Sequence, residues 1–344
     1  MLITWLSLSI FSLLAQPTLC APIRSRGATL EHRLSKRTIA GPKIDGANFP
    51  DPSIINVNDV WYAFATRTIG STIHVQVATS TDFETWSMRY NDDGSQFDAL
   101  PDLPSWVDDS TVLSSKVWGP DVNVLDDGTY IMYYSATTTS DNTKHCVAAA
   151  TSSTVQGPYT PQSGTLFCPL AKGGAIDPAG FNDNGQRYIV YKVDGNSIGN
   201  GGSCGNDVSP YVSTALLLQP VTSDGYTLQG TATTLLDNAG ASDQGIVEAP
   251  ALVKSGSTYV LFFSSGCYTT GNYNVDYATA SSLEGPYTRA GSALIVTGTS
   301  GLTAPGGADV TKDGERLIFH ATYGSGRALY TSTIQIADEA VTQA

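Results

Sequence analysis

The feature of this 344-residue sequence that most constrains its fold is a short motif that occurs five times. In each copy an acidic residue stands beside a proline or an alanine, and a strand-like run follows. The copies are PDPSII, GPDVNV, IDPAGF, EAPALV and GADVTK, and their acids are Asp51, Asp121, Asp177, Glu248 and Asp309. The acids are 70, 56, 71 and 61 residues apart, so the chain divides into five units of similar length. The fold must accommodate five copies of one unit.

Each unit contains short alternating apolar runs bounded by turn residues, and helical periodicity is nearly absent. Residues 147–160 and 275–288 are close copies of each other, and residues 75–86 are a looser copy. Five repeated units of this kind predict an all-β fold, a five-bladed β-propeller with four-stranded blades. A β-sandwich would not need five copies of one unit. Aromatic residues that alternate along the runs are expected to pack between blades: Tyr133, Tyr134, Phe262 and Phe263.

The N-terminal segment is predicted to lie outside this fold. The apolar run LITWLSLSIFSLLA predicts a secretory signal peptide over residues 1–20. The basic segment 21–37 ends in Lys36 and Arg37, which predicts a pro-segment removed at a dibasic site. Residues 38–344 are then expected to form one catalytic propeller domain, secreted and monomeric, since a propeller closes on itself. No other stretch is long and apolar enough to span a bilayer.

The predicted mature chain is strongly acidic. Residues 1–37 contain five of the 18 basic residues and one of the 31 acidic residues, which leaves 13 basic residues, 30 acidic residues and a net charge of −17. Such a chain repels nucleic acid and anionic membranes, and it suits a neutral or cationic partner.

Four cysteines remain after the predicted processing, and none has the CxxC spacing of a zinc site. An even number of cysteines in a secreted chain indicates two disulfides, for which three pairings are open. We favour Cys146–Cys168 with Cys204–Cys267.

Asp51 lies between Pro50 and Pro52, and proline restricts the backbone on both sides of it. A solvated turn acid is the simple interpretation of such a pair. In a propeller, however, the first strand of every blade lines the central axis, so equivalent acids from different blades converge on one cavity. Converging carboxylates shift each other's pKa values, and one ionised and one protonated carboxyl group are what inverting glycoside hydrolysis needs.

The motifs FPDPS, WGPDV, AIDPAGF and VEAPALV together resemble those of glycoside hydrolase family 43, over about residues 40 to 338. Members of that family are five-bladed propeller enzymes that act on arabinan, xylan and related side chains with inversion of configuration. The resemblance implies that Asp51 is the general base and that Glu248 is the general acid. It implies that Asp177 orients the acid and modulates its pKa.

The resemblance extends to three further positions. It implies that Trp118 lines the sugar pocket, with a core tryptophan as the alternative. It places His320 near a bound calcium ion or its waters, against the alternative of a core histidine, and no other cofactor is expected. It implies that Arg327 contacts the substrate or a catalytic acid, where a surface arginine is the alternative. Asp121 and Asp309 match no catalytic motif and are expected to be structural.

The sequence indicates less about the substrate than about the fold and the catalytic residues. The EAPALV motif resembles the arabinan-active branches more than β-xylosidases, which tend to carry E-G-P there. The Gly-rich loop 194–213 is a candidate to block one end of the substrate groove, which predicts exo action on a neutral plant cell-wall polysaccharide. An α-L-arabinofuranosidase or exo-arabinanase is the first expectation. Alternatives are an endo-arabinanase, a β-xylosidase, an exo-acting galactan hydrolase and, in a different class, a carbohydrate-binding propeller without catalysis.

Overall fold

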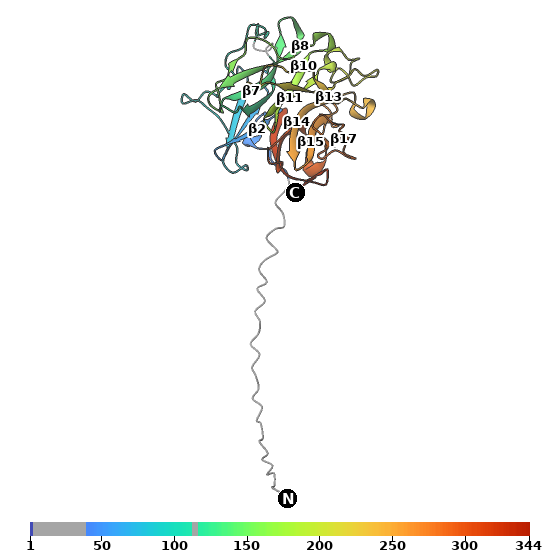
Figure 1. Cartoon of the computed structure of the whole chain (residues 1–344). Coiled ribbons are helices and arrows are strands. Elements are labelled where there is room, and N and C mark those ends of the chain that lie inside the picture. Colours follow the sequence, from blue (N-terminus) through green and yellow to red (C-terminus); the bar gives the residue numbers. More distant parts are fainter. Residues whose placement is uncertain (3–38, 112–115) are drawn as a thin grey trace. The chain divides into compact units, whose positions relative to one another are not determined.

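The computed structural model describes residues 1–2, 39–111 and 116–344, and the strands of the last two ranges form five antiparallel sheets. The sheets follow one another in chain order around a common centre, as the colour gradient from blue to red shows (Figure 1). The prediction of an all-β, five-bladed propeller is confirmed. The predicted signal peptide and pro-segment, residues 1–20 and 21–37, fall almost entirely outside the described residues. In the part of the chain that is described, no helix is long and apolar enough to cross a bilayer.

Each blade contains four antiparallel strands, and in blades 1 to 4 these follow the chain order with the first strand innermost. Blade 1 comprises β2 (Ser53–Val57), β3 (Val60–Ala65), β4 (Gln76–Ser80) and β5 (Ser87–Met88). Blade 2 comprises β6 (Trp118–Val124), β7 (Tyr130–Thr138), β8 (Asp141–Ser152) and β9 (Thr160–Pro161). Blade 3 comprises β10 (Ala175–Asp183), β11 (Gln186–Val193), β12 (Leu216–Val221) and β13 (Thr233–Leu236). Blade 4 comprises β14 (Val247–Ser255), β15 (Thr258–Ser265), β16 (Asp276–Ala280) and β17 (Thr288–Arg289).

Blade 5 closes the propeller with strands from both ends of the described domain. It contains β18 (Gly306–Val310), β19 (Arg316–Tyr323) and β20 (Gly326–Ala337), and its outer strand is β1 (Ile39–Ala40). The pairing joins Ile39 to Ser332 and Ala40 to Thr331. β21 (Ala340–Gln343) extends β20 at its end. Backbone hydrogen bonds between β1 and β20 therefore hold the ring closed.

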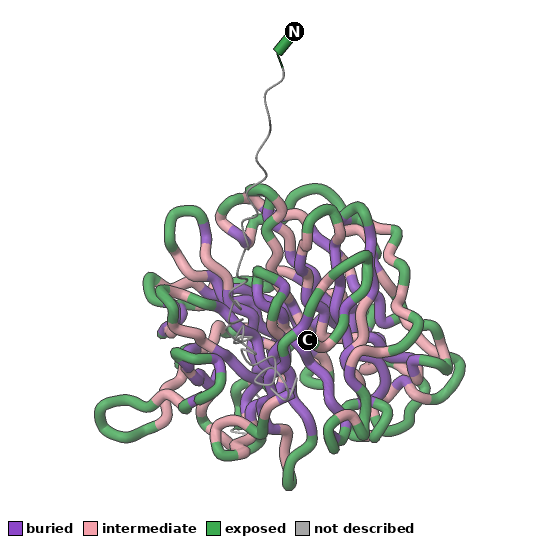
Figure 2. The backbone as a smooth tube through the Cα atoms, turned by 90° about the horizontal axis from the view of Figure 1, so that it is seen from below, coloured by how far each residue is buried: buried purple, intermediate pink, exposed green. Residues whose placement is uncertain are grey.

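Five apolar clusters lie between adjacent blades, one for each junction. Successive side chains of a strand point to opposite faces of its sheet, so neighbouring residues pack against different blades. Tyr134 packs between blades 1 and 2, and Tyr133 between blades 2 and 3. Phe263 and Phe262 alternate in the same way around blade 4. The predicted blade packing of these aromatics is confirmed. Figure 2 shows buried residues in the interior of the domain and exposed residues along the turns at its periphery.

The repeat between residues 147–160 and 275–288 has a structural counterpart. In both copies a tyrosine hydroxyl donates a hydrogen bond to the carbonyl oxygen four residues earlier, from Tyr159 to Val155 and from Tyr287 to Leu283.

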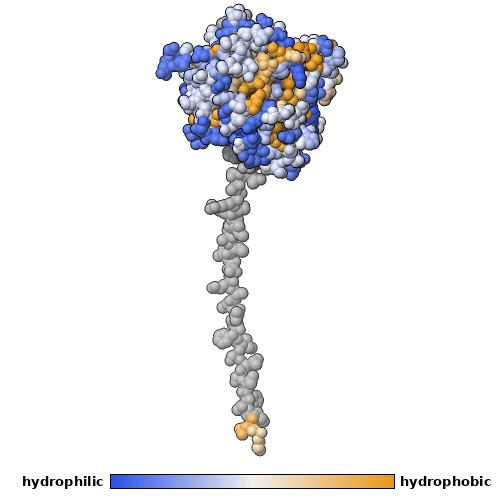
Figure 3. Space-filling view, turned by 45° about the horizontal axis from the view of Figure 1, so that its top comes forward, coloured by the Kyte–Doolittle hydropathy of each residue, from blue (hydrophilic) through white to orange (hydrophobic). Residues whose placement is uncertain are grey.

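Both favoured disulfides are present, Cys146–Cys168 and Cys204–Cys267. The face of the domain seen in Figure 3 is mostly hydrophilic, with a band of hydrophobic residues exposed on it.

Candidate active site

The site is built on one unusual backbone position in each blade. Asp51 and Asp177 both have φ of 51°, in the left-handed region, and Gly119, Ala249 and Gly307 hold the same place in the other blades with φ of 50°, 50° and 58°. A proline or an alanine follows each of them. The strand pairing is irregular at this point in blades 2 to 5. Such a bulge redirects a side chain away from the regular sheet face.

These positions surround a cavity of about 40 Å³, to which every blade contributes three consecutive residues. The cavity is large enough for water and too small for a sugar ring. Asp51 and Asp177 line it, and Glu248 does not.

The five motif acids do not occupy equivalent positions, so the expectation that they converge as equivalents was wrong. Asp51 and Asp177 take the left-handed position, Glu248 precedes it by one residue, and Asp121 and Asp309 follow it by two. Sequence spacing alone could not separate these cases, because backbone conformation decides which residue of the motif is redirected.

Asp121 and Asp309 join neighbouring blades. Asp121 Oδ2 accepts a hydrogen bond of 2.7 Å from the amide of Gly180 in blade 3. Asp309 Oδ2 accepts one of 2.7 Å from the amide of Ile54 in blade 1. Gly180 and Ile54 each lie three residues after an aspartate with a left-handed backbone conformation, Asp177 and Asp51, so the two hydrogen bonds occupy equivalent places in their blades. These contacts fit the structural role expected of both acids.

The glycines at the left-handed positions of blades 2 and 5 make room for the acids of the next blade. A Cβ atom on Gly119 would lie 3.2 Å from Asp177 Oδ1. A Cβ atom on Gly307 would lie 3.2 Å from Asp51 Oδ1 and 2.7 Å from the ring of His320. Non-glycine residues adopt this backbone conformation in the other three blades, so glycine is favoured at these two places mainly for the space that it leaves.

The Asp51 carboxylate is held by two side chains. Arg327 Nη1 donates to Asp51 Oδ1 at 2.8 Å, and Thr66 Oγ1 donates to Asp51 Oδ2 at 2.7 Å. The amide of Gly119 donates to Thr66 Oγ1, which directs the hydroxyl proton of Thr66 towards Asp51. Burial alone would raise the pKa of Asp51, but the Arg327 guanidinium and the Thr66 hydrogen bond outweigh it and hold the pKa below its usual value. Asp51 is an ionised carboxylate at neutral and mildly acidic pH.

His320 is fully buried and supports the backbone of Asp51. Its Nδ1 accepts a hydrogen bond of 3.0 Å from the Asp51 amide. Burial lowers the pKa of His320 to about 3, so the ring is neutral and its proton lies on Nε2. Nε2 lies 3.3 Å from Arg327 Nη1, which is a cation. These side chains do not fit a calcium ion bound directly to His320, and among the described residues no group of three or more His, Cys, Asp or Glu side chains forms a metal site.

Asp177 differs from Asp51 because it has no cationic partner in direct contact in the described structure. Its Oδ2 accepts a hydrogen bond of 2.9 Å from the amide of Ala249, the residue after Glu248. Burial, followed by the negative charge of Glu248, raises the pKa of Asp177 to about 7. The two left-handed aspartates are thus driven apart in pKa by their surroundings, which is the electrostatic arrangement expected of an acid–base site.

The raised pKa of Asp177 makes a prediction about stability. Between about pH 4 and pH 7 the folded state keeps a proton on Asp177 that the unfolded state has lost, so the free energy of unfolding falls as pH rises through this window. The variant Asp177→Asn is expected to lose less stability than the wild type between pH 5 and pH 8, and to melt a few degrees higher at pH 8. Thermal unfolding at several pH values measures this.

Asp51→Asn is the matched control for this prediction. The pKa of Asp51 is lowered, so its carboxylate stabilises the fold above pH 4, and the variant is expected to melt lower than the wild type at pH 8. Equal pH slopes for the wild type and Asp177→Asn would contradict the prediction.

Glu248 accepts a hydrogen bond at each carboxyl oxygen. Lys192 Nζ donates to Oε2 at 2.8 Å, and Tyr273 Oη donates to Oε1 at 2.8 Å. Lys192 is fully buried in β11, and its Nζ also lies 3.6 Å from Asp194 Oδ1. Burial alone would lower the pKa of Lys192, but the charges of Glu248 and Asp194 outweigh it and leave the pKa raised, so Lys192 is an ammonium ion.

Trp118 begins the inner strand of blade 2 and is partly exposed. Its ring stacks on the buried His145, with centroids 3.8 Å apart. One face of the indole is therefore covered by His145, and the partly exposed ring is suited to stack against a sugar. At another edge of the site, Tyr268 is 43% exposed and its ring lies 4.7 Å from the Arg327 guanidinium.

Sequence reasoning missed Thr66, Lys192, Tyr268 and Tyr273. Lys192 had a recognisable signal, because a single lysine inside the apolar run RYIVYKVD must be buried or paired. The tyrosines lie in the loop between β15 and β16 and carried no comparable signal.

The arrangement provides three carboxyl groups in different states. Asp51 is ionised and lines a water-sized cavity, Glu248 is held by two donors, and Asp177 has a raised pKa because of burial and the charge of Glu248. One carboxylate to activate water and one carboxyl group to protonate a leaving oxygen are the two groups that glycoside hydrolysis by general acid–base catalysis needs.

Comparisons with known proteins agree with this chemistry. Residues 44–338 match the family model described as glycosyl hydrolases family 43. The chain is 27% identical over 261 residues to an extracellular endo-α-(1→5)-L-arabinanase of Thermotoga petrophila, which covers 69% of this chain and 50% of the relative. It therefore spans about half the length of that relative. It is 26% identical to a β-D-galactofuranosidase of Aspergillus niger, with 70% of each chain covered.

The fold comparison gives the same result. The crystal structure of a thermostable family-43 glycoside hydrolase superposes with a TM-score of 0.70 at 21% identity, covering 86% of this chain and 92% of that one. This likeness shows the five-bladed fold.

Proposed function

Because the chain belongs to glycosyl hydrolases family 43, we propose that it is an inverting glycoside hydrolase that releases terminal α-L-arabinofuranose from plant cell-wall polysaccharide. The observation that carries the proposal is the contrast between Asp51, held ionised by Arg327, and Glu248, held by Lys192 and Tyr273. A carbohydrate-binding propeller without catalysis would not need two carboxyl groups prepared in different ways.

In the proposed reaction Asp51 is the general base and Glu248 is the general acid. Asp51 takes a proton from a water molecule, whose oxygen attacks the anomeric carbon. The glycosidic C–O bond breaks, and the leaving oxygen takes the proton of Glu248. Asp177 modulates the acid through its charge and through its hydrogen bond to Ala249. Trp118 and Arg327 are proposed to contact the sugar.

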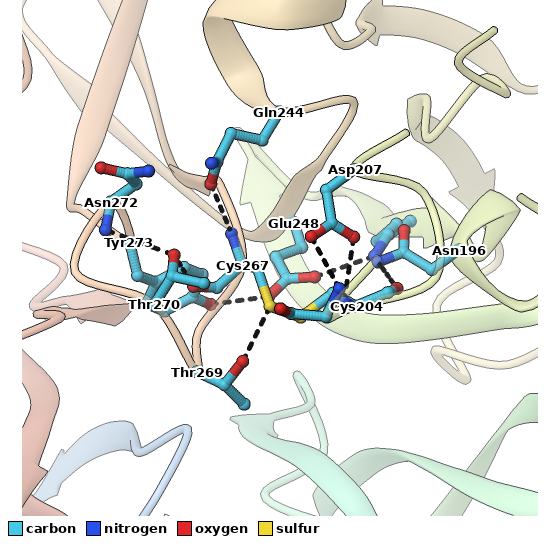
Figure 4. The surroundings of a disulfide bond; sticks show 12 residues. Asn196, Cys204, Asp207, Gln244, Glu248, Cys267, Thr269, Thr270, Asn272 and Tyr273 are labelled. Carbon is cyan, nitrogen blue, oxygen red and sulfur yellow. Dashed lines mark hydrogen bonds and ion pairs between the residues drawn. A yellow bond between two sulfur atoms is a disulfide. The ribbon is translucent and has the colours of Figure 1, made fainter. Parts of the chain in front are cut away.

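Exo action is supported by the loop 194–213. Its Cys204 is bonded to Cys267, six residues before Tyr273, so the loop lies beside the proposed acid and is suited to close one end of a groove. Figure 4 shows Glu248 next to this disulfide. Secretion is proposed from the extracellular location in the name of the Thermotoga relative and from the predicted signal peptide. We also propose that the protein acts as a monomer.

β-D-Galactofuranoside hydrolysis is a second candidate. The Aspergillus relative of that name matches over 70% of both chains, a more balanced coverage than the arabinanase provides. The two sugars share the five-membered ring and the configuration of its ring carbons, so one pocket can be compatible with either.

The proposal is tested by incubating the purified protein with linear arabinan, arabinoxylan, xylo-oligosaccharides and the 4-nitrophenyl glycosides of α-L-arabinofuranose, β-D-galactofuranose and β-D-xylose. Arabinose released from the outset is the expected result. Early arabino-oligosaccharides would indicate endo action, and galactose or xylose would replace the sugar in the proposal. No product from any substrate would overturn it in favour of a binding protein.

Arg327 makes a prediction about the pH profile. In Arg327→Met the guanidinium that lowers the pKa of Asp51 is lost, so the acid limb of kcat/KM is expected to move to higher pH. Arg327→Lys keeps the charge and is the control, with a smaller displacement. An unchanged acid limb in Arg327→Met, measured across pH 3 to 8, would be incompatible with Asp51 as the base.

A further inference from the structure

The two donors that hold Glu248 come from different blades. Lys192 lies near the end of β11 in blade 3, and Tyr273 lies in the loop between β15 and β16 in blade 4. Each carboxyl oxygen accepts from one of them, at 2.8 Å in both cases. A carboxyl group that is bonded at both oxygens from opposite sides has its plane fixed. Each oxygen retains a second lone-pair direction, which leaves a place for the proton that a general acid must deliver.

Both donors are themselves rigid. Lys192 is fully buried between β10 and β12 and has a second carboxylate, Asp194, 3.6 Å away. Tyr273 is 2% exposed, and its ring stacks on His320 with centroids 5.7 Å apart. A Cβ atom on Gly306 would lie 2.1 Å from the Tyr273 ring, so the strand backbone also packs against it. Burial raises the pKa of Tyr273 well above its usual value, so the phenol remains a donor.

A disulfide joins the segments that carry these donors. Cys204 lies in the loop that follows Lys192 and Asp194, and Cys267 begins the loop that contains Tyr273. Figure 4 shows Glu248 and Tyr273 beside the sulfur atoms, with Asn196 and Asp207 on the Cys204 side. Asn196 Nδ2 donates to the carbonyl of Cys204, and Asp207 accepts from its amide. On the other side, Thr270 donates to the carbonyl of Cys267 through both its amide and its hydroxyl.

The buried Asn206 ties the same loop to the segment that leads into the strand carrying the acid. Its side-chain amide donates to the carbonyls of Val212 and Gly245, at 2.8 and 2.6 Å. Gly245 lies three residues before Glu248. The loop is therefore anchored independently of the disulfide, and the disulfide adds the connection to the Tyr273 loop.

We propose that Lys192 and Tyr273 are positioning residues that hold the Glu248 carboxyl group in the orientation from which it protonates the leaving oxygen, and that the Cys204–Cys267 disulfide fixes the two loops against each other. This inference rests on the proposed function, because it assigns a role towards the general acid of that reaction. It predicts a signature that a merely structural role would not produce. Loss of either donor impairs the substrates that need protonation and spares those that do not.

The test uses a series of aryl and alkyl α-L-arabinofuranosides whose leaving groups range from 2,4-dinitrophenol, which departs without protonation, to an alcohol. Tyr273→Phe keeps the ring and removes only the hydroxyl. Its kcat is expected to fall about tenfold to hundredfold with the alcohol and about twofold or less with 2,4-dinitrophenol. Lys192→Met is expected to follow the same trend with a larger loss, and thermal unfolding shows whether that variant remains folded.

Matched controls separate this effect from general destabilisation. Tyr159→Phe also removes a buried tyrosine hydroxyl, which bonds Val155 in blade 2, and is expected to lower Tm without any dependence on the leaving group. The double variant Cys204→Ser/Cys267→Ser is expected to show the leaving-group dependence. Cys146→Ser/Cys168→Ser, which removes the disulfide adjoining His145 and Trp118, is expected to lack it.

The outcomes are distinguishable. If Glu248→Gln shows leaving-group dependence and Tyr273→Phe and Lys192→Met do not, the positioning role is wrong and the proposed function stands. If Glu248→Gln itself shows no dependence, the assignment of the acid fails. An equal loss of kcat with every leaving group in Tyr273→Phe would reduce that residue to a structural role and would overturn the inference.

Discussion

Asp51→Ala is expected to lower kcat/KM for arabinofuranosides by about a thousandfold to ten-thousandfold while the domain stays folded. The carboxylate lines the axial cavity and is kept ionised by Arg327 and Thr66, so its loss leaves no group to take the proton from the attacking water. Steady-state kinetics and thermal unfolding of the variant measure the two parts of this prediction.

Sodium azide provides a more specific test of the same residue. Azide is an anion and attacks the anomeric carbon without a base, while Glu248 still protonates the leaving oxygen. Asp51→Ala in azide is therefore expected to regain activity with an activated aryl arabinofuranoside and to yield the glycosyl azide of inverted configuration. Asp121→Asn changes an acid that lines the same cavity but bonds Gly180, and azide is not expected to affect it. A retained product configuration would contradict the assignment of Asp51 as base.

Glu248→Gln is expected to lose about a thousandfold or more in kcat with natural glycosidic linkages, because an alcohol leaves poorly as its anion. With 2,4-dinitrophenyl arabinofuranoside the loss is expected to stay within about tenfold, since that leaving group needs no proton. The slope of log kcat against the pKa of the leaving group measures the effect, and it is expected to be much steeper in the variant than in the wild type.

The same variant has a structural cost that needs separate measurement. Glutamine can still accept a hydrogen bond, but it removes the charge that faces the buried ammonium of Lys192. A buried ion without its partner is destabilising, so Tm is expected to fall. Kinetics are therefore measured well below the variant's Tm. A loss of kcat that is the same for every leaving group would exclude Glu248 as the proton donor.

The fold was predictable because every blade must bury both faces of its sheet, so the same residue pattern repeats five times. A blade is a sheet with two faces to bury, and in a closed ring each face packs against the next blade. Every unit therefore needs the same alternation of apolar residues, which is visible in runs such as 130–138 and 258–265. Closure by β1 was not predictable, because a two-residue strand at Ile39–Ala40 carries no periodicity.

The five units, the acidic motifs, and the placement of Asp51, Asp177 and Glu248 at or just before the start of inner strands can all be read from local sequence. These are local properties, since proline restricts its neighbours and alternation defines a strand. Only the folded domain shows what each acid bonds. Asp51 accepts hydrogen bonds from Arg327 and Thr66, whereas Asp121, which lines the same cavity, accepts one from the amide of Gly180. The tertiary structure also decided the partners of Glu248. Lys192 and Tyr273 are 81 residues apart and reach Glu248 only because adjacent blades pack side by side, with a disulfide between their loops.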